Sequence, residues 1–288
     1  MHKILQKLLF MVMYMNESVS RGYLNEPYRL FHFTDKRDAD FEAHSHDFHK
    51  MVFCLKGRVT YIMEGNSYEL QSGDMLLIPQ GQIHRSILHG ETEYERMILW
   101  VKDSFLCSFG EEALLGPFAP RQGDGALYRP VPPHRGRLME KLTGMERSLK
   151  SDLPGARLMQ DTWLIQFLLE LNGQLALLPP RPMASVRTDP KVQEILQYIN
   201  SHLSEEMTVE QLSRRFFISS SHLMHTFRQH AGCSVHQYIR QKRLSFACDR
   251  LREGERVLQA AAQAGFRDYS AFLKAFRSQY GYSPREMK

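Results

Sequence analysis

A repeat in the last third of the chain limits the folds that this sequence can adopt more than any other feature. When the segment that begins at Phe217 is shifted by 49 residues, identical residues align along its length. The aligned pairs are Phe217 with Phe266, Ser221 with Ser270, Phe227 with Phe276, Arg228 with Arg277, Gly232 with Gly281, and Ser234 with Ser283. Self-similarity at a fixed offset indicates that one structural unit occurs twice.

The first copy has the pattern of two short helices joined by a tight turn. The sequence TVEQ at 208–211 is a capping box, which satisfies the free amide groups at a helix start. Ser219 is placed to cap a second helix, in which Leu223 and Phe227 supply the apolar side. Gly232 is the residue at which this helix is expected to end.

The second copy follows the same plan. A helix is predicted over 257–264, Gly265 makes the turn, and Asp268 caps a second helix that ends at Gly281. Two helices in this order predict a helix-turn-helix motif, in which the second helix presents its N-terminal half to a DNA major groove.

A third helix is predicted between the copies. Residues 235–252 carry an apolar stripe at helical spacing and five basic residues outside that stripe. Successive major-groove faces on one side of B-DNA lie about 34 Å apart. A stiff spacer helix is therefore expected to hold two recognition helices so that one chain reads two adjacent half-sites.

The excess of positive charge falls in the same part of the chain. The formal net charge of the 288 residues is +5, yet residues 1–187 carry 22 basic and 22 acidic side chains. Residues 188–288 carry 15 basic against 10 acidic side chains. This division favours a polyanionic partner for the last third alone. The proline-rich sequence LPPRPMAS at 178–185 predicts an extended linker between the two parts.

The sequence AAAQAGFRDYSAFLKAFRSQYGYSPREMK at 260–288 resembles the C-terminal signature of the AraC/XylS family of transcriptional regulators. The resemblance implies DNA binding through two helix-turn-helix units joined by a helix, the arrangement that the repeat predicts independently. Ala260, Met287 and Lys288 depart from the residues that are usual in the family at these positions. These departures concern packing detail.

The resemblance also implies which side chains read DNA. The base-reading positions of the family fall on Ser221, His222, Met224 and His225 in the first unit, and on Tyr269, Ser270, Ala271 and Lys274 in the second. Arg228 and Arg277 lie one turn further along their helices, where contact with phosphate is expected because phosphates take half or more of protein–DNA hydrogen bonds. An exposed helix face without a role is the alternative for the two histidines.

Short alternating strands are predicted between residues 28 and 101. Their apolar segments are MVFCL at 51–55, VTYIM at 59–63, YEL at 68–70, MLLI at 75–78 and RMILWV at 96–101. Turns are predicted at 56–57, 64–66 and 72–74, each of which contains a glycine. Regular short strands of this kind are typical of a barrel or a sandwich.

Two histidine motifs in this region resemble those of the cupin fold, whose histidines and one glutamate often hold a metal. His44 and His46 are expected on one face of a strand, and His84 follows the glycine and proline pattern of the second motif. The acidic ligand of the cupin pattern would fall at Lys50 or Met51, and neither supplies a carboxylate. Because a lysine ammonium repels a divalent cation, we favour a pocket without metal.

We therefore predict that His44, His46 and His84, joined by Tyr61, bind a small polar ligand at the barrel mouth. Three histidines alone can hold zinc, so a metal remains an alternative, as do histidines at the barrel rim with no ligand. No cofactor and no catalytic residue are predicted.

The predicted fold class is α+β. The expected segments are a leader helix over 1–27, a cupin-like β-barrel over 28–120, a helical dimerisation region over 121–178, a linker over 179–189, and an all-α domain of two helix-turn-helix units over 190–288. The dimer contact is implied by the family architecture, since the stripes at 138–149 and 158–171 would otherwise pack on their own domain.

The expected cellular setting is the cytoplasm. The apolar stretch at 8–15 is too short for the roughly 20 residues of a bilayer span, and no signal-peptide cleavage pattern follows it. The four cysteines are far apart in the sequence and are expected to be reduced core thiols.

The favoured function is sequence-specific regulation of transcription in response to a small-molecule effector. The family analogy implies an activator and a sugar effector, with double-stranded DNA and RNA polymerase as partners, a homodimer as the assembly and no membrane partner. Two other hypotheses are a metal-dependent cupin enzyme and a ligand-independent DNA-binding protein whose N-terminal half only dimerises.

Overall fold

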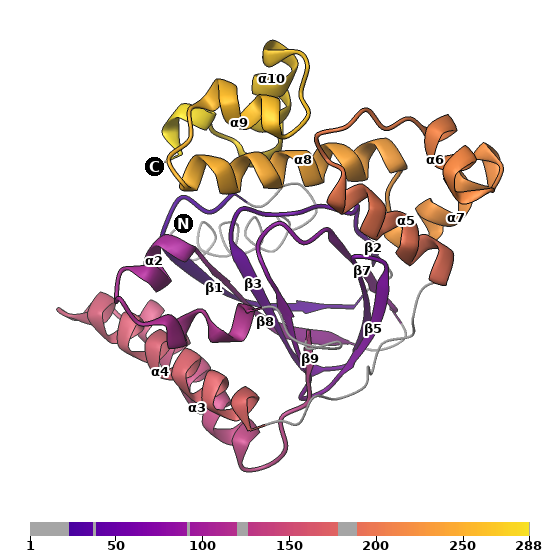
Figure 1. Cartoon of the computed structure of the whole chain (residues 1–288). Helices are drawn as coiled ribbons and strands as arrows, with labels where there is room; N and C mark the ends of the chain where they lie inside the picture. Colours follow the sequence, from indigo (N-terminus) through magenta and orange to yellow (C-terminus); the bar gives the residue numbers. More distant parts are fainter. Residues whose placement is uncertain (1–22, 37–38, 91–92, 120–125, 178–188, 288) are drawn as a thin grey trace, which may run out of the picture.

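The protein is described here by a computed structural model that covers residues 23–36, 39–90, 93–119, 126–177 and 189–287. Strands followed by helices form the N-terminal part, and helices alone form the last third (Figure 1). The predicted α+β class with an all-α C-terminal domain is thereby confirmed. Most of the predicted leader helix (1–27) and nearly all of the predicted linker (179–189) lie outside the described residues.

The strands of the described residues form two antiparallel sheets. The first sheet contains, in spatial order, β1 (Tyr28–Asp35), β8 (Tyr94–Val101), β3 (His49–Lys56), β6 (Met75–Ile78) and β9 (Leu127–Tyr128). The second contains β2 (Ala39–Asp40), β7 (His84–Leu88), β4 (Arg58–Met63) and β5 (Asn66–Gln71). The strands thus form a two-sheet, cupin-like jelly roll instead of one continuous closed barrel. All five predicted strands are present, whereas β1, β2, β7 and β9 were not predicted.

Strand β3 is buried on both faces, which explains its unbroken apolar sequence. Val52 and Cys54 face the second sheet, and Met51 and Phe53 belong to a separate core shared with the helices that cover the first sheet. The split follows from the alternation of side chains along a strand. The even positions of β3 therefore point into the space between the two sheets.

Helices α3 (His134–Leu149) and α4 (Ala156–Ala176) cover the outer face of the first sheet (Figure 1). Both were predicted from apolar stripes. A Cβ atom at Gly144 would lie 2.6 Å from the Trp163 ring, so glycine is required where the two helices approach most closely. Three short helices precede them, namely α2 (Asp103–Cys107), η1 (Glu112–Leu114) and η2 (Gly116–Phe118).

The C-terminal domain contains the two predicted helix pairs. Its helices are α5 (Pro190–Ser201), α6 (Val209–Phe216), α7 (Ser220–Ala231), α8 (Val235–Arg252), α9 (Val257–Gln263), α10 (Tyr269–Tyr280) and η3 (Pro284–Glu286). The first unit, α6–α7, and the second unit, α9–α10, lie at opposite ends of the spacer helix α8 (Figure 1). The capping box at 208–211 and the glycine ends at Gly232 and Gly281 are as predicted.

The two turns differ by one residue, which corrects one pair of the sequence alignment. The amide of Ile218 donates to the carbonyl of Ser213, and the amide of Phe266 donates to the carbonyl of Ala261 in the same way. Ile218 is therefore the structural partner of Phe266. Phe217, aligned with Phe266 in the sequence, instead occupies the left-handed position that Gly265 fills in the second unit.

The two domains pack directly on each other. Ile83, just before β7, is buried in the core of the first unit together with Leu212, Phe227 and Tyr238. Helix α8 runs along the top of the β-domain in the same view (Figure 1). A residue of the N-terminal domain thus completes the core of the DNA-binding domain.

The cysteine prediction needs one correction. Cys54, Cys233 and Cys248 are buried free thiols, as expected, but Cys107 is exposed at the end of α2. Among the helices of the described residues, none has the length and apolar character needed to cross a membrane.

Candidate DNA-binding surface and histidine pocket

The first recognition helix, α7, has one buried and one exposed side. The Ser219 hydroxyl accepts the His222 amide at 3.2 Å and fixes the helix start, while Leu223 and Phe227 anchor the buried side. The predicted DNA-contacting residues of this unit are all exposed; they are Ser221, His222, Met224, His225 and Arg228. Capping and the apolar anchor together turn these five side chains outward.

The second recognition helix, α10, is built in the same way with a different cap. The Asp268 carboxylate accepts the amides of Ser270 and Ala271 at 2.8 and 3.1 Å. Ser270, Ala271, Lys274 and Arg277 are exposed. Tyr269 is half-buried, because its ring packs near Phe272 with the ring centres 6.3 Å apart. Tyr269 therefore also contributes to the core of the unit.

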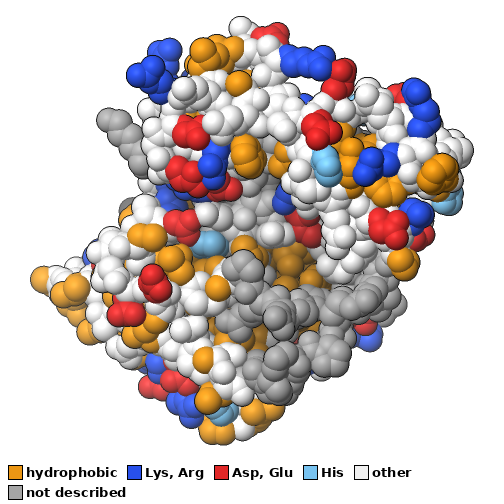
Figure 2. All heavy atoms as spheres, viewed as in Figure 1, with side chains coloured by type: hydrophobic (Ala, Val, Ile, Leu, Met, Phe, Trp, Pro, Cys, Tyr) orange, Lys and Arg blue, Asp and Glu red, His pale blue; other side chains and the backbone are white. Residues whose placement is uncertain are grey.

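Charged groups are mixed along this edge of the molecule. Figure 2 shows Lys and Arg side chains projecting from the outer edges of the C-terminal helices, with acidic groups between them. The positive charge is thus distributed over the outer surface of both units, where a DNA backbone can be contacted.

A feature that sequence reasoning missed lies in the turn of the first unit. Phe217 has a φ of +53° and its side chain is 93% exposed. Its ring lies beside a shallow groove of about 570 Å³ that is also lined by Glu210, Ser213, Arg214, Ile218, Ser219 and Ser220. A bulky residue in this conformation is uncommon, and only its place at the turn of the repeat could have indicated it.

The three predicted pocket histidines lie together. Suitable nitrogen atoms of His44, His46 and His84 are all within 4.8 Å of one another. The backbones of His44 and His84 exchange two hydrogen bonds of 3.0 and 2.9 Å. The strand predicted for His44 and His46 is not formed, however, because this exchange is an isolated bridge in an otherwise irregular segment.

Two of the imidazoles have defined tautomers. Nδ1 of His44 lies 2.7 Å from the Glu42 carbonyl, and Nδ1 of His84 lies 3.0 Å from the Gln82 carbonyl. A carbonyl can only accept, so Nδ1 carries a proton in both rings, and Nε2 keeps its lone pair in a ring that is neutral. Burial, together with the nearby His44 and Lys50, holds the pKa of His84 well below its usual range. The His84 side chain is therefore neutral at physiological pH.

The cluster of three histidines offers an acceptor without a protein donor. His84 is 1% exposed, and its Nε2 has no hydrogen-bond partner among the described residues. A buried polar atom of this kind is uncommon in folded proteins unless a ligand, an ion or a water molecule serves it. The imidazole of His84 is thus suited to accept a hydrogen bond from a bound molecule.

Lys50 is the residue that distinguishes this cluster from a cupin metal site. It occupies an even position of β3, is 6% exposed, and places Nζ 6.0 Å from the centre of the Tyr61 ring. Tyr61 is buried on β4 in the core between the sheets. The donor set therefore contains three imidazoles, an ammonium and a phenol ring. The ammonium opposes a divalent cation, so the residues present fit a metal poorly.

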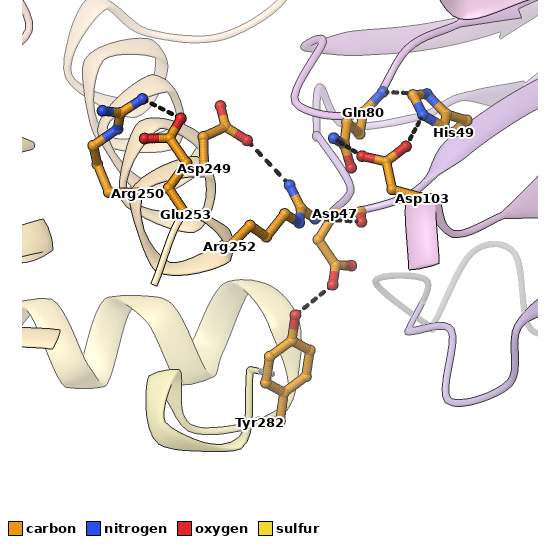
Figure 3. A network of polar contacts seen from close by, with 9 residues as sticks. All are labelled: Asp47, His49, Gln80, Asp103, Asp249, Arg250, Arg252, Glu253 and Tyr282. Carbon is orange, nitrogen blue, oxygen red and sulfur yellow. Dashed lines mark hydrogen bonds and ion pairs between the residues drawn. The ribbon is translucent and has the colours of Figure 1, made fainter. Parts of the chain in front are cut away.

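A second polar group, on the opposite face of β3, was not predicted. Nε2 of His49 is 2.5 Å from Asp103, whose carboxylate also accepts from Gln80 (Figure 3). Burial alone would raise the pKa of Asp103, but the hydrogen bonds from His49 and Gln80 and the charges of His49 and Arg252 hold it below its usual range. His49 is thus committed to Asp103 and lies outside the cluster of three histidines.

Comparisons with known proteins identify the family. Residues 26–168 match the AraC-like ligand binding domain, and residues 212–288 match a helix-turn-helix domain. The chain belongs to the AraC family of transcriptional regulators. It is 25% identical over 255 residues to the HTH-type transcriptional activator RhaS of Salmonella schwarzengrund, covering 87% of this chain and 88% of that relative.

Solved structures of similar proteins include two with different coverage. An apo ToxT variant from Vibrio cholerae covers 92% of this chain and 98% of its own, with 14% identity and a TM-score of 0.40. The DNA-binding domain of AdpA in complex with a target DNA covers 34% of this chain and 89% of its own, with 30% identity and a TM-score of 0.32.

Proposed function

We propose that this AraC-family chain is a sequence-specific transcription activator that responds to a small-molecule effector. The observation that carries the proposal is the pair of capped recognition helices, α7 and α10, each with its candidate DNA-contacting side turned outward. The name of the relative RhaS supports activation. In this assignment, α7 and α10 enter successive major grooves while α8 sets their separation.

The residues divide by chemistry into two groups. His222, His225 and Lys274 carry hydrogen-bonding groups that can read base edges, and Met224 offers an apolar contact. Arg228 and Arg277 contact phosphate and set the position of each helix. Small side chains at Ser221, Ser270 and Ala271 permit close approach, and the Tyr269 hydroxyl completes the second surface.

Selection from random DNA tests this assignment directly. Full-length protein is incubated with a pool of random duplexes, and bound sequences are enriched, sequenced and footprinted. We expect two short conserved elements whose centres are about 10 base pairs apart, the spacing of successive major grooves. Enrichment of a single element, or of no sequence at all, would refute reading by both units.

The pocket of His44, His46, His84 and Tyr61 is proposed as the effector site. The Nε2 atom of His84 supplies a lone pair and Lys50 supplies N–H donors, a combination that suits a hydroxyl-rich molecule such as a sugar. The proposed mechanism is linkage, in which the effector binds one arrangement of the two domains better than the other. No covalent chemistry is involved, so the protein is not proposed to be an enzyme.

Reciprocity gives the test of this mechanism. A sugar library is screened by calorimetry against the protein alone and against the protein saturated with its selected DNA. An effector must change DNA affinity by the same factor by which DNA changes effector affinity. A sugar that binds with equal affinity in both states would disprove the linkage while leaving the DNA-binding proposal intact.

A dimer through α4 is proposed as the assembly. Leu158 and Leu169 are 71% and 43% exposed, and they lie three helical turns apart on the same side of α4. We expect Leu158→Glu together with Leu169→Glu to convert a dimer to a monomer in sedimentation experiments. Met159→Glu, about 100° around the helix, is the matched control. A wild-type monomer at micromolar concentration would refute the assembly.

The cytoplasm is the proposed location, and RNA polymerase is the proposed partner at the promoter. Four free cysteines fit a reducing compartment, and the described helices give no support for a membrane partner. In vitro transcription with purified polymerase on the selected site should increase when the protein is added.

A further inference from the structure

The pocket histidines lie on a segment that also touches the DNA-binding domain. This segment, residues 43–47, has its even positions bonded to the N-terminal domain: His44 pairs with His84, and the carbonyl of His46 accepts the Gly81 amide at 2.8 Å. The side chains of His44 and His46 form two of the three members of the pocket cluster. The even residues of the segment therefore form part of the histidine cluster.

The odd positions of the same segment bond to the DNA-binding domain. The carbonyl of Ala43 accepts from Gln241 at 3.3 Å, that of Ser45 accepts from Gln279 at 2.9 Å, and that of Asp47 accepts from Arg252 at 2.8 Å. In addition, the Tyr282 hydroxyl donates to the Asp47 carboxylate (Figure 3). Three successive odd residues thus contact α8, α10 and the residue segment after α10.

The histidine on the neighbouring strand is linked to α8 through a second carboxylate. Glu64 accepts the amide of Ile83, the residue next to His84, at 2.8 Å. The same carboxylate accepts Lys242 Nζ at 3.1 Å and the hydroxyl of Tyr238, both from α8. His44 and His46 are therefore next to carbonyls that bond to the DNA-binding domain, whereas His84 is linked to that domain through Ile83 and Glu64.

These contacts reach both helix-turn-helix units. Tyr238 and Ile83 belong to the core of the first unit, whereas Gln279 lies on α10 of the second. His44 and His46 are joined to the odd carbonyls by rigid planar peptide groups, so a shift of the even residues toward a ligand moves the odd carbonyls. Among the described residues, segment 43–47 contributes both to the histidine cluster and to the hydrogen bonds with α8 and α10, so it joins the two directly.

We propose that residues 43–47 transmit occupancy of the histidine pocket to both recognition units through the hydrogen bonds of Ala43, Ser45 and Asp47. This inference rests on the proposed function only in taking the pocket as the effector site. A ligand that draws His44 and His46 inward changes the carbonyl positions that hold α8 and α10. The relative orientation of the two units, and hence the half-site geometry they fit, follows from that change.

Amide hydrogen exchange on the full-length protein tests the route without DNA or effector. His84→Gln perturbs the histidine cluster itself. Tyr282→Phe with Gln279→Leu removes two contacts between segment 43–47 and the DNA-binding domain, and these are called the outside substitutions. We expect His84→Gln to raise exchange in α10 about fivefold or more, the lower end of typical coupling between sites. In the background of the two outside substitutions, His84→Gln should leave α10 unchanged while it still affects residues 43–47.

The reverse experiment remains informative if His84→Gln fails to fold. Tyr282→Phe removes one hydroxyl at the domain boundary, and histidine-selective NMR then follows the imidazole signals of His44 and His46. We expect both signals to shift. The matched control is Tyr198→Phe on α5, whose ring packs on His202 within its own domain and should leave the pocket signals in place.

The outcomes separate this route from the proposed function. Exchange changes confined to the strands after His84→Gln, or equal α10 effects with and without the outside contacts, would overturn the route. So would pocket signals that respond equally to Tyr282→Phe and Tyr198→Phe. Because neither assay uses DNA or effector, a failure of the regulator proposal would show in the DNA selection and the sugar screen instead.

Discussion

The DNA-reading surface and the histidine pocket are held in place by different means. Each reading helix is fixed mainly within its own unit, by a capping residue such as Ser219 or Asp268 and by buried phenylalanines, although Ile83 of the N-terminal domain adds to the core of the first unit. His44 and His46, in contrast, lie outside any regular strand and are fixed by hydrogen bonds to distant segments. A substitution on a locally fixed helix should leave neighbouring contact residues in place. A substitution in a site assembled from distant segments should shift all of its side chains.

The largest expected effect concerns the pocket. Lys50→Glu places a carboxylate where the cupin pattern has its acidic ligand, and it removes the ammonium that opposes a cation. We expect wild-type protein to retain no zinc after dialysis and the variant to retain one equivalent, measured by elemental analysis. His46→Ala together with His84→Ala in the same variant should abolish that zinc, because only His44 and the introduced carboxylate remain, fewer than the three protein ligands that a zinc site needs.

Lys56→Glu is the matched control for this change. Lys56 ends the same strand but is exposed and paired with Glu93, so its substitution should give no zinc. One equivalent of zinc on the wild-type protein would show that Lys50 does not exclude metal. The pocket would then be a three-histidine metal site, and the metal-dependent alternative would return.

The next effect tests whether the second reading unit is an independent local structure. Phe276 is fully buried between Phe272 and Tyr280, so Phe276→Ala leaves a cavity and should lower the free energy of unfolding by about 3–5 kcal/mol. Urea denaturation measures the loss, with exposed Phe217→Ala as the control. Hydrogen exchange should rise in α8–α10 and stay unchanged in the two sheets. A rise throughout the protein would contradict local fixation.

The same difference explains what could be predicted from sequence. Caps, turn glycines and apolar stripes act within a few residues, so the helices from α6 to α10 were predicted from the sequence nearly to their ends. The one-residue difference between the turns was not predicted, because the left-handed conformation of Phe217 is unusual for a bulky side chain. Only the second unit has a glycine, Gly265, at this turn position.

The pocket was predicted only in part. The spacing of His44, His46 and His84 indicated that the three histidines belong to one site, and the structure places them together. Sequence reasoning placed either Lys50 or Met51 at the position of the acidic ligand, and the burial of Lys50 beside Tyr61 depends on which face of β3 points inward. The bonds from Arg252 and Tyr282 to Asp47 cross more than 200 residues of sequence, and no local pattern encodes them.

Base reading by a single residue gives a smaller effect. His225→Ala on α7 should remove the preference at one position of the selected site, at a cost of about 1–3 kcal/mol against the preferred base. Competition with single-base variants of that site measures it. Gln229→Ala, exposed one turn further along α7, should leave the preference unchanged. Loss of preference at several positions would show that the helix itself has moved.

Phosphate contact should act on every sequence alike. Arg228→Ala is expected to weaken binding to selected and random DNA by the same factor, and to reduce the slope of log affinity against log salt by about 0.9. Titrations at several salt concentrations measure this slope. Arg285→Ala, which removes a charge outside the recognition helices, should change the slope less. An effect confined to one base pair would instead assign Arg228 to base reading.

The smallest effect concerns the turn in which the two units differ. The φ of +53° destabilises Phe217 relative to a glycine at the same position. Glycine, however, increases the conformational entropy of the unfolded chain. Phe217→Gly should therefore raise the free energy of unfolding by at most about 1 kcal/mol. The mirror substitution Gly265→Ala should lower it, because a Cβ there would lie 2.4 Å from the carbonyl oxygen of Leu203. Urea denaturation compares the two. A stabilised Phe217→Gly variant that binds the selected DNA less tightly would show that the exposed ring serves binding at the expense of stability.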